Sequence, residues 1–462
     1  MRVIRPGYDP AQMAIGVVHF GPGAFFRAHQ ADYFDQLLAR EPGWGICAVS
    51  LKSTGVRDAL LPQDGLYTLV EKGPQTQVRV IGALREVLVG PEQHAAVMAR
   101  VADPGLKLIT MTVTEKGYCL DAAGALDLNH TDIRHDLANP AVPRSLVGWL
   151  VQALRVRRAV GPVPIVSCDN LADNGVRLKN AVLTMVRHIA PDLVEWIAAA
   201  ISFPRTMVDS ITPATDDALR AEVRAALVME DAWPIQREPF TQFVVDDTIG
   251  AVDESLRNVG VVITSDVRAY EQAKLRLLNG AHSTLAYMGA LRGFETVAEA
   301  MNDPDLAGHI TALMDDDILP TLKAPPGFDV RRYAADLRMR FRNPAIRHKL
   351  LQIAWDGSQK LPVRIVPTII DALAVGRSTE RLAVSLAAWM QFVRRQATAN
   401  IAIVDPLADE LAALGRSCVG DDGDVPIFFR LQAVFPPSLT SNDNFVSQLT
   451  NAYRALALTL QH

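Results

Sequence analysis

Short apolar runs alternate with amphipathic stretches through the first half of the chain. The compact runs lie at 14–20 ("AIGVVHF"), 45–51, 106–113 and 163–168, and the stretch "AHQADYFDQLLAR" between the first two has apolar residues at helical spacing. Strands that alternate with helices in this way predict a mostly parallel α/β sheet. The stretch 67–84 differs, because its pattern is that of an antiparallel ribbon with a polar tip.

Helical periodicity dominates the second half of the chain. Apolar residues recur every three or four positions in four segments, 267–291, 303–316, 380–397 and 443–459. Prolines in "LPTLKAPPGFD" predict a loop between helices. We therefore expect an α/β domain over residues 1–265, followed by a largely α-helical domain over residues 266–462.

Composition places the chain among soluble globular proteins. Of its 462 residues, 49% are hydrophobic and 21% charged, and the net charge is −5. This charge and the absence of a basic tail argue against nucleic-acid binding. No apolar run is long enough for a membrane span, and the N-terminal stretch has no signal-peptide pattern. Four scattered cysteines predict buried thiols, and together these features predict a cytoplasmic protein.

A glycine turn follows the first apolar run, in "VVHFGPGAFFRAHQ". The order strand, Gly21-x-Gly23, helix suits a dinucleotide, because the glycines permit a tight turn and close approach of a pyrophosphate to the helix N-terminus. Candidate cofactor-binding residues are the two glycines with Ala24 and Phe25. The third glycine of the usual fingerprint is replaced by Phe26, so a plain structural turn is the alternative.

The end of the second strand leaves the choice of cofactor open. An acidic residue there commonly binds the ribose hydroxyls of NAD, whereas this strand ends in Ser50, Leu51 and Lys52. Asp58 lies further on and reads equally well as an ordinary helix residue. NAD is the expected cofactor, NADP is not excluded, and Lys52 would favour the additional phosphate of NADP.

Polar residues interrupt the helix in "AKLRLLNGAHSTLAYMGAL" (273–291). On an α-helical wheel, Asn279 lies about 140° from Lys274, with His282 between them and Glu271 on the same flank. These groups are costly to bury without partners. The alternatives are a solvated lysine, a satisfied core histidine, and a helix end at Asn279-Gly280.

Hydride transfer to a carbonyl is a reaction that would use such a groove. A lysine whose pKa burial has lowered can donate a proton to the developing alkoxide and take it back in the reverse direction. Amide groups can hold the carbonyl oxygen as charge grows, and a histidine can orient the substrate. This chemistry requires no metal.

Four motifs in order resemble those of the polyol-specific long-chain dehydrogenases, the mannitol dehydrogenase family, whose members include mannitol 2-dehydrogenases and fructuronate reductases. The motifs are "GPGAFFRAHQ", "SCDNLADNG", "FPRTMVDSITP" and "KLRLLNGAHS". The resemblance runs from about residue 14 to beyond 365. It implies a Rossmann-type N-terminal domain and an NAD(P)-dependent oxidoreductase acting on CH–OH groups, without a metal.

The resemblance also implies roles for individual residues. Lys274 would be the general acid/base, Asn279 and Asn170 would polarise the substrate carbonyl, and His282 would position the substrate. Asp209 and Glu271 would line the site, and Lys360 in "DGSQKLP" would reach the substrate from the second domain.

Three positions depart from the family pattern. Ser210 replaces the arginine of the family's "VDRI" sequence, and Gly55 stands where an aspartate tends to follow the second strand. Gln352 replaces an arginine of the mannitol-specific members, which favours the hexuronate-reductase branch.

The resulting hypothesis is interconversion of a ketohexuronate and a hexonate, D-fructuronate and D-mannonate. Lys360, Arg364 or His348 would bind the substrate carboxylate. The alternative within the same class is a dehydrogenase for mannitol, arabinitol or a similar sugar alcohol. A protein that binds the dinucleotide as a sensor is a third hypothesis. The expected partner is a small sugar acid or polyol, and the expected state is a monomer or small homo-oligomer.

Overall fold

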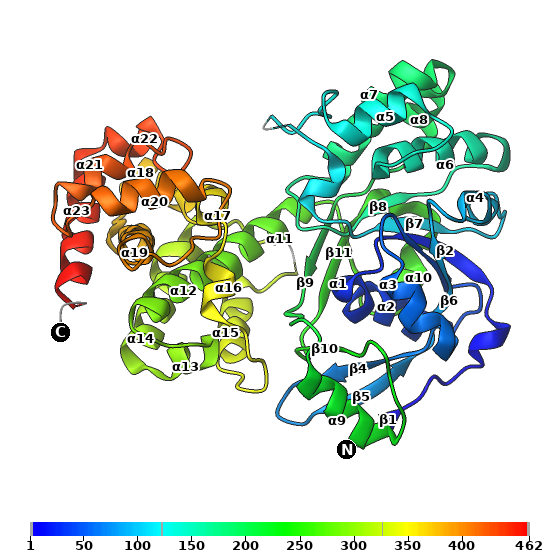
Figure 1. Ribbon diagram of the computed structural model, residues 1–462, viewed down its shortest axis with the longest axis horizontal. Coiled ribbons are helices and arrows are strands. Elements are labelled where there is room, and N and C mark those ends of the chain that lie inside the picture. The colour runs from blue at the N-terminus through cyan, green and yellow to red at the C-terminus, as the bar shows by residue number, and fades with distance from the viewer. Residues whose placement is uncertain (1–2, 122, 326, 460–462) are drawn as a thin grey trace. The chain divides into compact units, whose positions relative to one another are not determined.

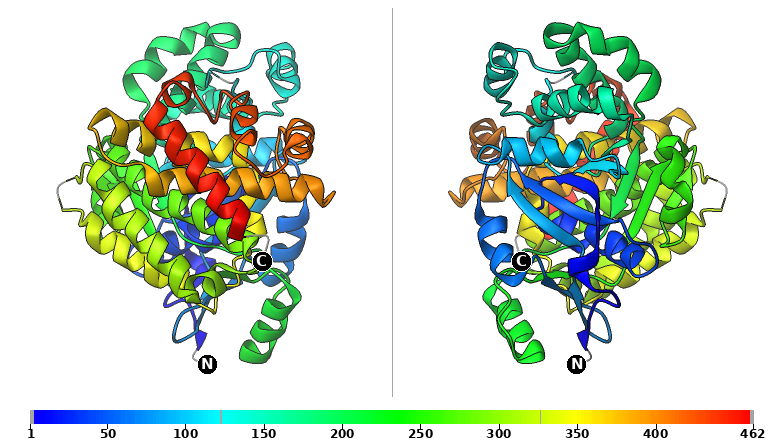
Figure 2. Two further views of the ribbon diagram at one scale, coloured as in Figure 1. Left: turned by 90° about the vertical axis from the view of Figure 1, so that its left-hand side faces the viewer. Right: turned by 90° about the vertical axis from the view of Figure 1, so that its right-hand side faces the viewer.

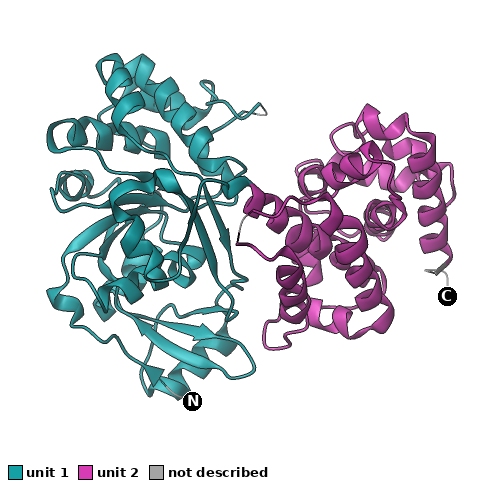
Figure 3. Ribbon diagram, turned by 180° about the vertical axis from the view of Figure 1, so that it is seen from behind, with its two compact units in different colours: residues 1–268 teal, residues 269–462 magenta. Residues whose placement is uncertain are grey.

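A computed structural model describes residues 3–121, 123–325 and 327–459. The chain forms two compact units, unit 1 (Met1–Arg268) and unit 2 (Ala269–His462), shown in Figure 3.

Unit 1 is built on a five-stranded sheet with the strand order β6-β3-β2-β7-β8 (Figure 1). All four neighbouring pairs are parallel. The strands are β6 (Leu84–Val89), β3 (Gly45–Ser50), β2 (Ile15–Phe20), β7 (Leu108–Met111) and β8 (Ile165–Ser167). The four apolar runs predicted as strands are β2, β3, β7 and β8. The order reverses between β2 and β7, which makes their carboxyl ends the crevice where such sheets bind dinucleotides.

Successive side chains of β2 point to opposite faces of this sheet and enter two separate cores. Val18 and Phe20 pack with α4 (His94–Val101), α6 (Leu146–Val160) and α7 (Asn174–Ile189). Val17 packs on the other face with α2 (Gln30–Leu38), α3 (Gly55–Leu60) and α10 (Asp253–Arg257). Helices on both faces explain why these strands are mostly apolar and largely buried.

Two smaller sheets complete unit 1. The predicted ribbon is confirmed as the antiparallel pair β4 (Tyr67–Glu71) and β5 (Gln77–Ile81), which β1 (Val3–Ile4) and β10 (Ile235–Arg237) extend. In the third sheet, β11 (Gln242–Asp246) lies between β12 (Val262–Thr264) and β9 (Thr206–Asp209).

Unit 2 is helical, and Figure 2 shows its helices from two sides. The predicted helix at 267–291 comprises α11 (Val267–Ala273), a π-helical segment η6 (Lys274–Gly280) and α12 (Ala281–Leu291). Helix α19 (Glu380–Thr398) packs against α12, α20 (Ala408–Ser417) and α23 (Asp443–Thr459). Unit 2 also contains α14 (Pro304–Ala312), α15 (Val330–Phe341), α16 (Leu350–Ala354), α17 (Gly357–Arg364) and α18 (Val366–Ala374), with the short turn η8 (Leu319–Thr321).

The cysteines are free and buried, as predicted. Within the residues that the structure describes, no helix is long and apolar enough to cross a membrane.

Candidate active site

The turn after β2 requires glycine at its first position. Gly21 has φ +86°, and its N–H donates to the carbonyl of Val49 over 2.9 Å. A Cβ atom at Gly21 would lie 2.2 Å from the carbonyl oxygen of Thr112, which follows β7. Backbone conformation and close approach of the two strand ends therefore both exclude larger residues.

The second glycine of the turn has space beside it. Gly23 is the N-cap of α1 (Ala24–Ala28), and the nearest atom to a Cβ placed there would be the Gly21 oxygen at 3.9 Å. Packing within the chain thus does not require glycine at this position. The free space at a helix start on the crevice of the sheet fits a pyrophosphate that approaches the backbone closely.

The position of the missing third glycine is filled by an aromatic stack. The ring of Phe26 lies 3.4 Å from the imidazole of His19 in β2, with the planes 9° apart. His19 is fully buried, and burial lowers its pKa to about 3. The helix therefore packs on the strand through two flat rings instead of through a glycine. Phe25, the other predicted contact residue, is half-buried and stacks on His29.

The end of β3 carries no carboxylate, as the sequence indicated. Lys52 is exposed and forms an ion pair with Asp132 over 3.4 Å. Asp58 accepts hydrogen bonds from the guanidinium of Arg57. Gly55 begins α3, and a Cβ there would touch only the ring of Trp233.

Asp169 joins the loops that follow β7 and β8, and sequence reasoning missed it. Its carboxylate accepts the N–H of Val113 at 3.0 Å, the N–H of Thr114 at 2.9 Å and the hydroxyl of Tyr118 at 2.7 Å. Burial raises the pKa of Asp169. The sequence signal that could have identified Asp169 is its position directly before Asn170 in the motif "SCDNLADNG".

These bonds hold an unusual backbone. Thr114 has φ 68° and ψ 162°, a region populated almost only by glycine and costing on the order of 1–3 kcal/mol. The strained turn lies at the carboxyl end of β7, beside the glycine turn. Asn170 is exposed on the loop after β8, and Asp209 is buried at the end of β9, opposite Gln242 in β11.

The π segment changes the predicted arrangement of the catalytic helix. Lys274 and Asn279 are five residues apart, which an α-helical wheel places about 140° from each other. Because π-helical hydrogen bonds join residue i to residue i+5, these two residues lie one above the other in η6. The helix also continues through Asn279 and Gly280, so the alternative of a helix end there is wrong.

Burial differs along this flank. Lys274 is 7% exposed, whereas Glu271 and Asn279 are half-buried. Lys274 is thus largely removed from solvent, and its acid/base role stays a prediction.

Unit 2 brings His282 and His348 together. Their rings are 4.9 Å apart in an edge-to-face arrangement, and Phe341 stacks on His282 at 4.6 Å. Burial, with the nearby positive side chains, holds the pKa of His282 well below its usual value, and burial lowers that of His348 to about 4. Both imidazoles are therefore neutral at pH 7.

Three cationic side chains, Arg364, Arg340 and Lys360, act on His282, and Lys360 also acts on His348. The positive charges of Lys360 and Arg364 both disfavour protonation of His282. The Lys360 ammonium donates to the carbonyl of Ile353 over 3.3 Å, and Arg364 donates to the hydroxyl of Ser283 over 3.1 Å.

Two buried ring nitrogens of this cluster stand out among the described residues. Across the described part of the chain, neither Nε2 of His282 nor Nδ1 of His348 has a hydrogen-bond partner. Neutral imidazoles next to cationic side chains can bind hydroxyl groups and a carboxylate. Gln352 is exposed on α16, outside these contacts.

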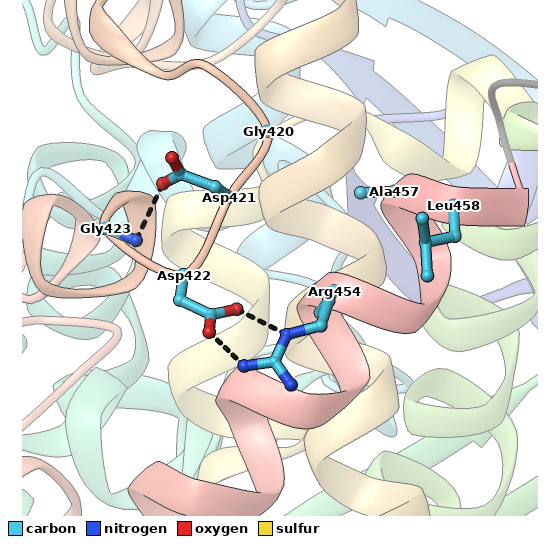
Figure 4. A pocket seen from close by; sticks show the side chains of 7 residues that line it. All are labelled: Gly420, Asp421, Asp422, Gly423, Arg454, Ala457 and Leu458. Atoms are coloured by element: carbon cyan, nitrogen blue, oxygen red, sulfur yellow. Dashed lines mark hydrogen bonds and ion pairs between the residues drawn. The ribbon is translucent and has the colours of Figure 1, made fainter.

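A separate surface pocket of about 520 Å³ contains none of the predicted site residues (Figure 4). An ion pair between Asp422 and Arg454 forms part of its wall. Within the residues described, no group of three or more His, Cys, Asp or Glu is arranged to hold a metal ion.

Comparison with known proteins shows the family of this chain. Residues 15–256 match the mannitol dehydrogenase Rossmann domain, and residues 266–457 match the mannitol dehydrogenase C-terminal domain. The chain is 40% identical to D-mannonate oxidoreductase of Escherichia coli (strain K12), over 98% of this chain and 96% of that protein. It is 37% identical to polyol:NADP oxidoreductase of Gluconobacter oxydans (strain 621H), over 85% and 83% of the two chains.

A solved structure is similar over the whole chain. Mannitol 2-dehydrogenase of Pseudomonas fluorescens, in a ternary complex with NAD and D-mannitol, has a TM-score of 0.84 and 37% identity, covering 100% of this chain and 96% of that one. The chain belongs to the mannitol dehydrogenase family and is an oxidoreductase acting on CH–OH groups.

Proposed function

We propose that this protein reduces a ketohexuronate to a hexonate, D-fructuronate to D-mannonate, with NADH, and catalyses the reverse oxidation. The observation that carries the proposal is the cluster of unit 2, in which two unpartnered imidazole nitrogens lie near Lys360 and Arg364. A sugar acid offers both hydroxyl groups and a carboxylate to such a cluster. The 40% identity to a D-mannonate oxidoreductase supports the same substrate.

NAD fits the glycine turn of unit 1. Gly21 permits the tight turn, and the space beside Gly23 admits a pyrophosphate at the start of α1, next to Ala24 and Phe25. When bound, the nicotinamide supplies the hydride that reduces the ketone. The absence of a carboxylate at the end of β3 leaves room for NADP as a second cofactor.

Lys274 is the proposed general acid. Its ammonium donates a proton to the substrate oxygen as the hydride reaches the ketone carbon, so that the products are a secondary alcohol and oxidised cofactor. In the reverse direction the neutral amine takes the hydroxyl proton. Asn279, one turn above Lys274 in η6, donates its amide N–H to the same oxygen as negative charge develops there.

The cluster of unit 2 is the proposed binding site for the rest of the sugar acid. Neutral His282 and His348 bind substrate hydroxyl groups, and Lys360 and Arg364 bind the carboxylate. The roles implied for Asn170, Asp209 and Glu271 remain predictions.

A polyol dehydrogenase is the second candidate. Mannitol in the similar ternary complex and the name of the polyol:NADP oxidoreductase favour it. A polyol has no carboxylate, so in this candidate the substrate would not use the charges of Lys360 and Arg364.

The test measures oxidation of NADH and NADPH with D-fructuronate, D-tagaturonate and D-fructose in parallel. Turnover of D-fructuronate well above that of D-fructose supports the proposal, and turnover of D-fructose alone contradicts it. Lys274→Ala should abolish turnover while NADH still binds. Arg364→Gln should raise KM for the uronate more than for any neutral sugar that is turned over.

A further inference from the structure

The π segment η6 has a charged anchor on the side opposite the catalytic residues. Arg276 follows Lys274 by two positions, which turns the chain through roughly half a circle. Its side chain is buried, with 9% of its surface exposed. Arg276 therefore points into unit 2.

Three contacts fix the guanidinium of Arg276. One nitrogen lies 2.6 Å from the carboxylate of Asp371 in α18. Another donates to the hydroxyl of Thr321 at 2.9 Å and to its carbonyl at 3.3 Å. The hydroxyl of Thr321 in turn donates to the carbonyl of Ile318. A planar guanidinium bound to two elements at once cannot rotate without losing one of these bonds.

The far end of η6 is fixed by packing. A Cβ at Gly280 would lie 2.9 Å from the carbonyl oxygen of Arg364 and 3.3 Å from the side chain of Ile365. The end of α17 thus lies directly against the last residue of the π segment. Charge anchors the segment near its start, and close backbone packing anchors it at its end.

We propose that Arg276 is a positioning residue that holds η6 in the π-helical register. The register places Asn279 above Lys274, whereas α-helical hydrogen bonding would turn Asn279 away by about 140°. Short π segments are uncommon and occur mostly at functional sites. The catalytic roles of Lys274 and Asn279 in this assignment rest on the proposed function. The part that concerns the register of η6 does not.

Arg276→Gln tests the assignment in the full-length protein. We expect kcat to fall about 100-fold, the loss typical of a misplaced catalytic group, with KM for NADH unchanged. Arg276→Lys retains the charge opposite Asp371 but not the bonds in two directions, so we expect an intermediate kcat. Arg292→Gln is the matched control, because Arg292 ends the same helix and its ion pair with Asp303 lies outside η6.

Asp371→Asn provides a second variant if Arg276→Gln does not fold, since the Asp371 side chain is half exposed. Asp371→Asn should also lower kcat, but by less than Arg276→Gln does. The assignment would be overturned if kcat of Arg276→Gln equalled that of the control Arg292→Gln. The same holds if Asp371→Asn is the variant measured and its kcat equals that of the control. A rise in KM for NADH together with the fall in kcat would indicate general damage and would also overturn it.

A crystal structure separates this inference from the proposed function. If the wild-type protein reduces none of the three sugars, the proposed function fails. The hydrogen-bond register of η6 can still be determined from a crystal structure of Arg276→Gln. Replacement of the π hydrogen bonds by α-helical ones supports the anchoring role. Retention of the π register in the variant contradicts it.

Discussion

Buried neutral histidines make the stability of this protein sensitive to acid. The pKa of His19 is about 3, far below the value of about 6.5 for a histidine in an unfolded chain. Between these two values the unfolded chain binds a proton at this residue and the folded chain does not. The free energy of unfolding therefore falls as the pH drops from 6.5 towards 3, and this contribution is fully present only above that range.

His19→Gln should reduce this sensitivity. One fully shifted histidine contributes a slope of about 1.4 kcal/mol per pH unit below pH 6. We expect the free energy of unfolding of the variant, measured by urea denaturation between pH 4 and 6, to depend less steeply on pH by about that amount. His188→Gln, at an exposed position of α7, is the control and should keep the wild-type slope. Equal slopes in all three proteins would show that His19 is not the source.

Asp169 should be needed for the turn at the end of β7. In Asp169→Asn, an amide can replace only one of the two oxygens that accept the N–H groups of Val113 and Thr114. We expect a loss of about 1–3 kcal/mol in the free energy of unfolding and weaker NADH binding, measured by fluorescence titration. Tyr118→Phe removes a single donor and should have the smaller effect. NADH binding at wild-type strength in Asp169→Asn would separate the turn from the cofactor site.

Single residues could be predicted where their type is chemically restricted. Gly21 could be identified from the sequence because the tight turn after a strand favours glycine. The cysteines could be identified as buried because they are few and scattered. Asp169 was not, because a carboxylate bound to backbone N–H groups leaves no pattern in the sequence. The pairing of His282 with His348 depends on residues 66 positions apart, which no local pattern connects.

At the level of elements, the close contact between η6 and the end of α17 depends on Gly280, which has no side chain. Gly280→Ala places a Cβ against the carbonyl of Arg364, a backbone atom that cannot turn aside. We expect a loss of about 1–3 kcal/mol in thermal or urea denaturation and a higher KM for the sugar acid, since Arg364 is displaced.

Gly308→Ala gives the matched comparison for this prediction. Gly308 lies in α14 with no atom within 4 Å of a Cβ placed there. The same change should stabilise the protein by about 0.4–1 kcal/mol, because alanine restricts the unfolded chain. A destabilising effect of similar size at both positions would mean that packing against α17 is not the cause.

Elements were predictable wherever their periodicity is regular. The parallel strands, the ribbon and the long helices follow from apolar spacing alone. The π segment does not, because its hydrogen bonds are set by contacts of Arg276 and Gly280 with distant elements. The wheel for residues 271–282 assumed an α-helix throughout and for that reason separated Lys274 from Asn279.

For the whole molecule, the two units should respond differently to cofactor. The glycine turn lies in unit 1, and each unit has its own packed interior. NADH at 100 times its Kd should stabilise unit 1 by about 2.7 kcal/mol. Hydrogen exchange with mass spectrometry in urea measures the free energy of opening of α6 in unit 1 and of α19 in unit 2 separately. Only the value for α6 should increase by the full amount. Equal shifts would mean that the units unfold together or that the cofactor binds elsewhere.

The boundary between the units also affects how the chain can be compared with its relatives. Arg268, the last residue of unit 1, lies inside α11, and the π segment begins six residues later. A π turn accommodates one residue more than an α turn. An alignment to a relative with a regular helix here needs a one-residue gap within Lys274–Gly280. Without the gap, His282 and every later residue of the helix would be assigned a direction wrong by about 100°.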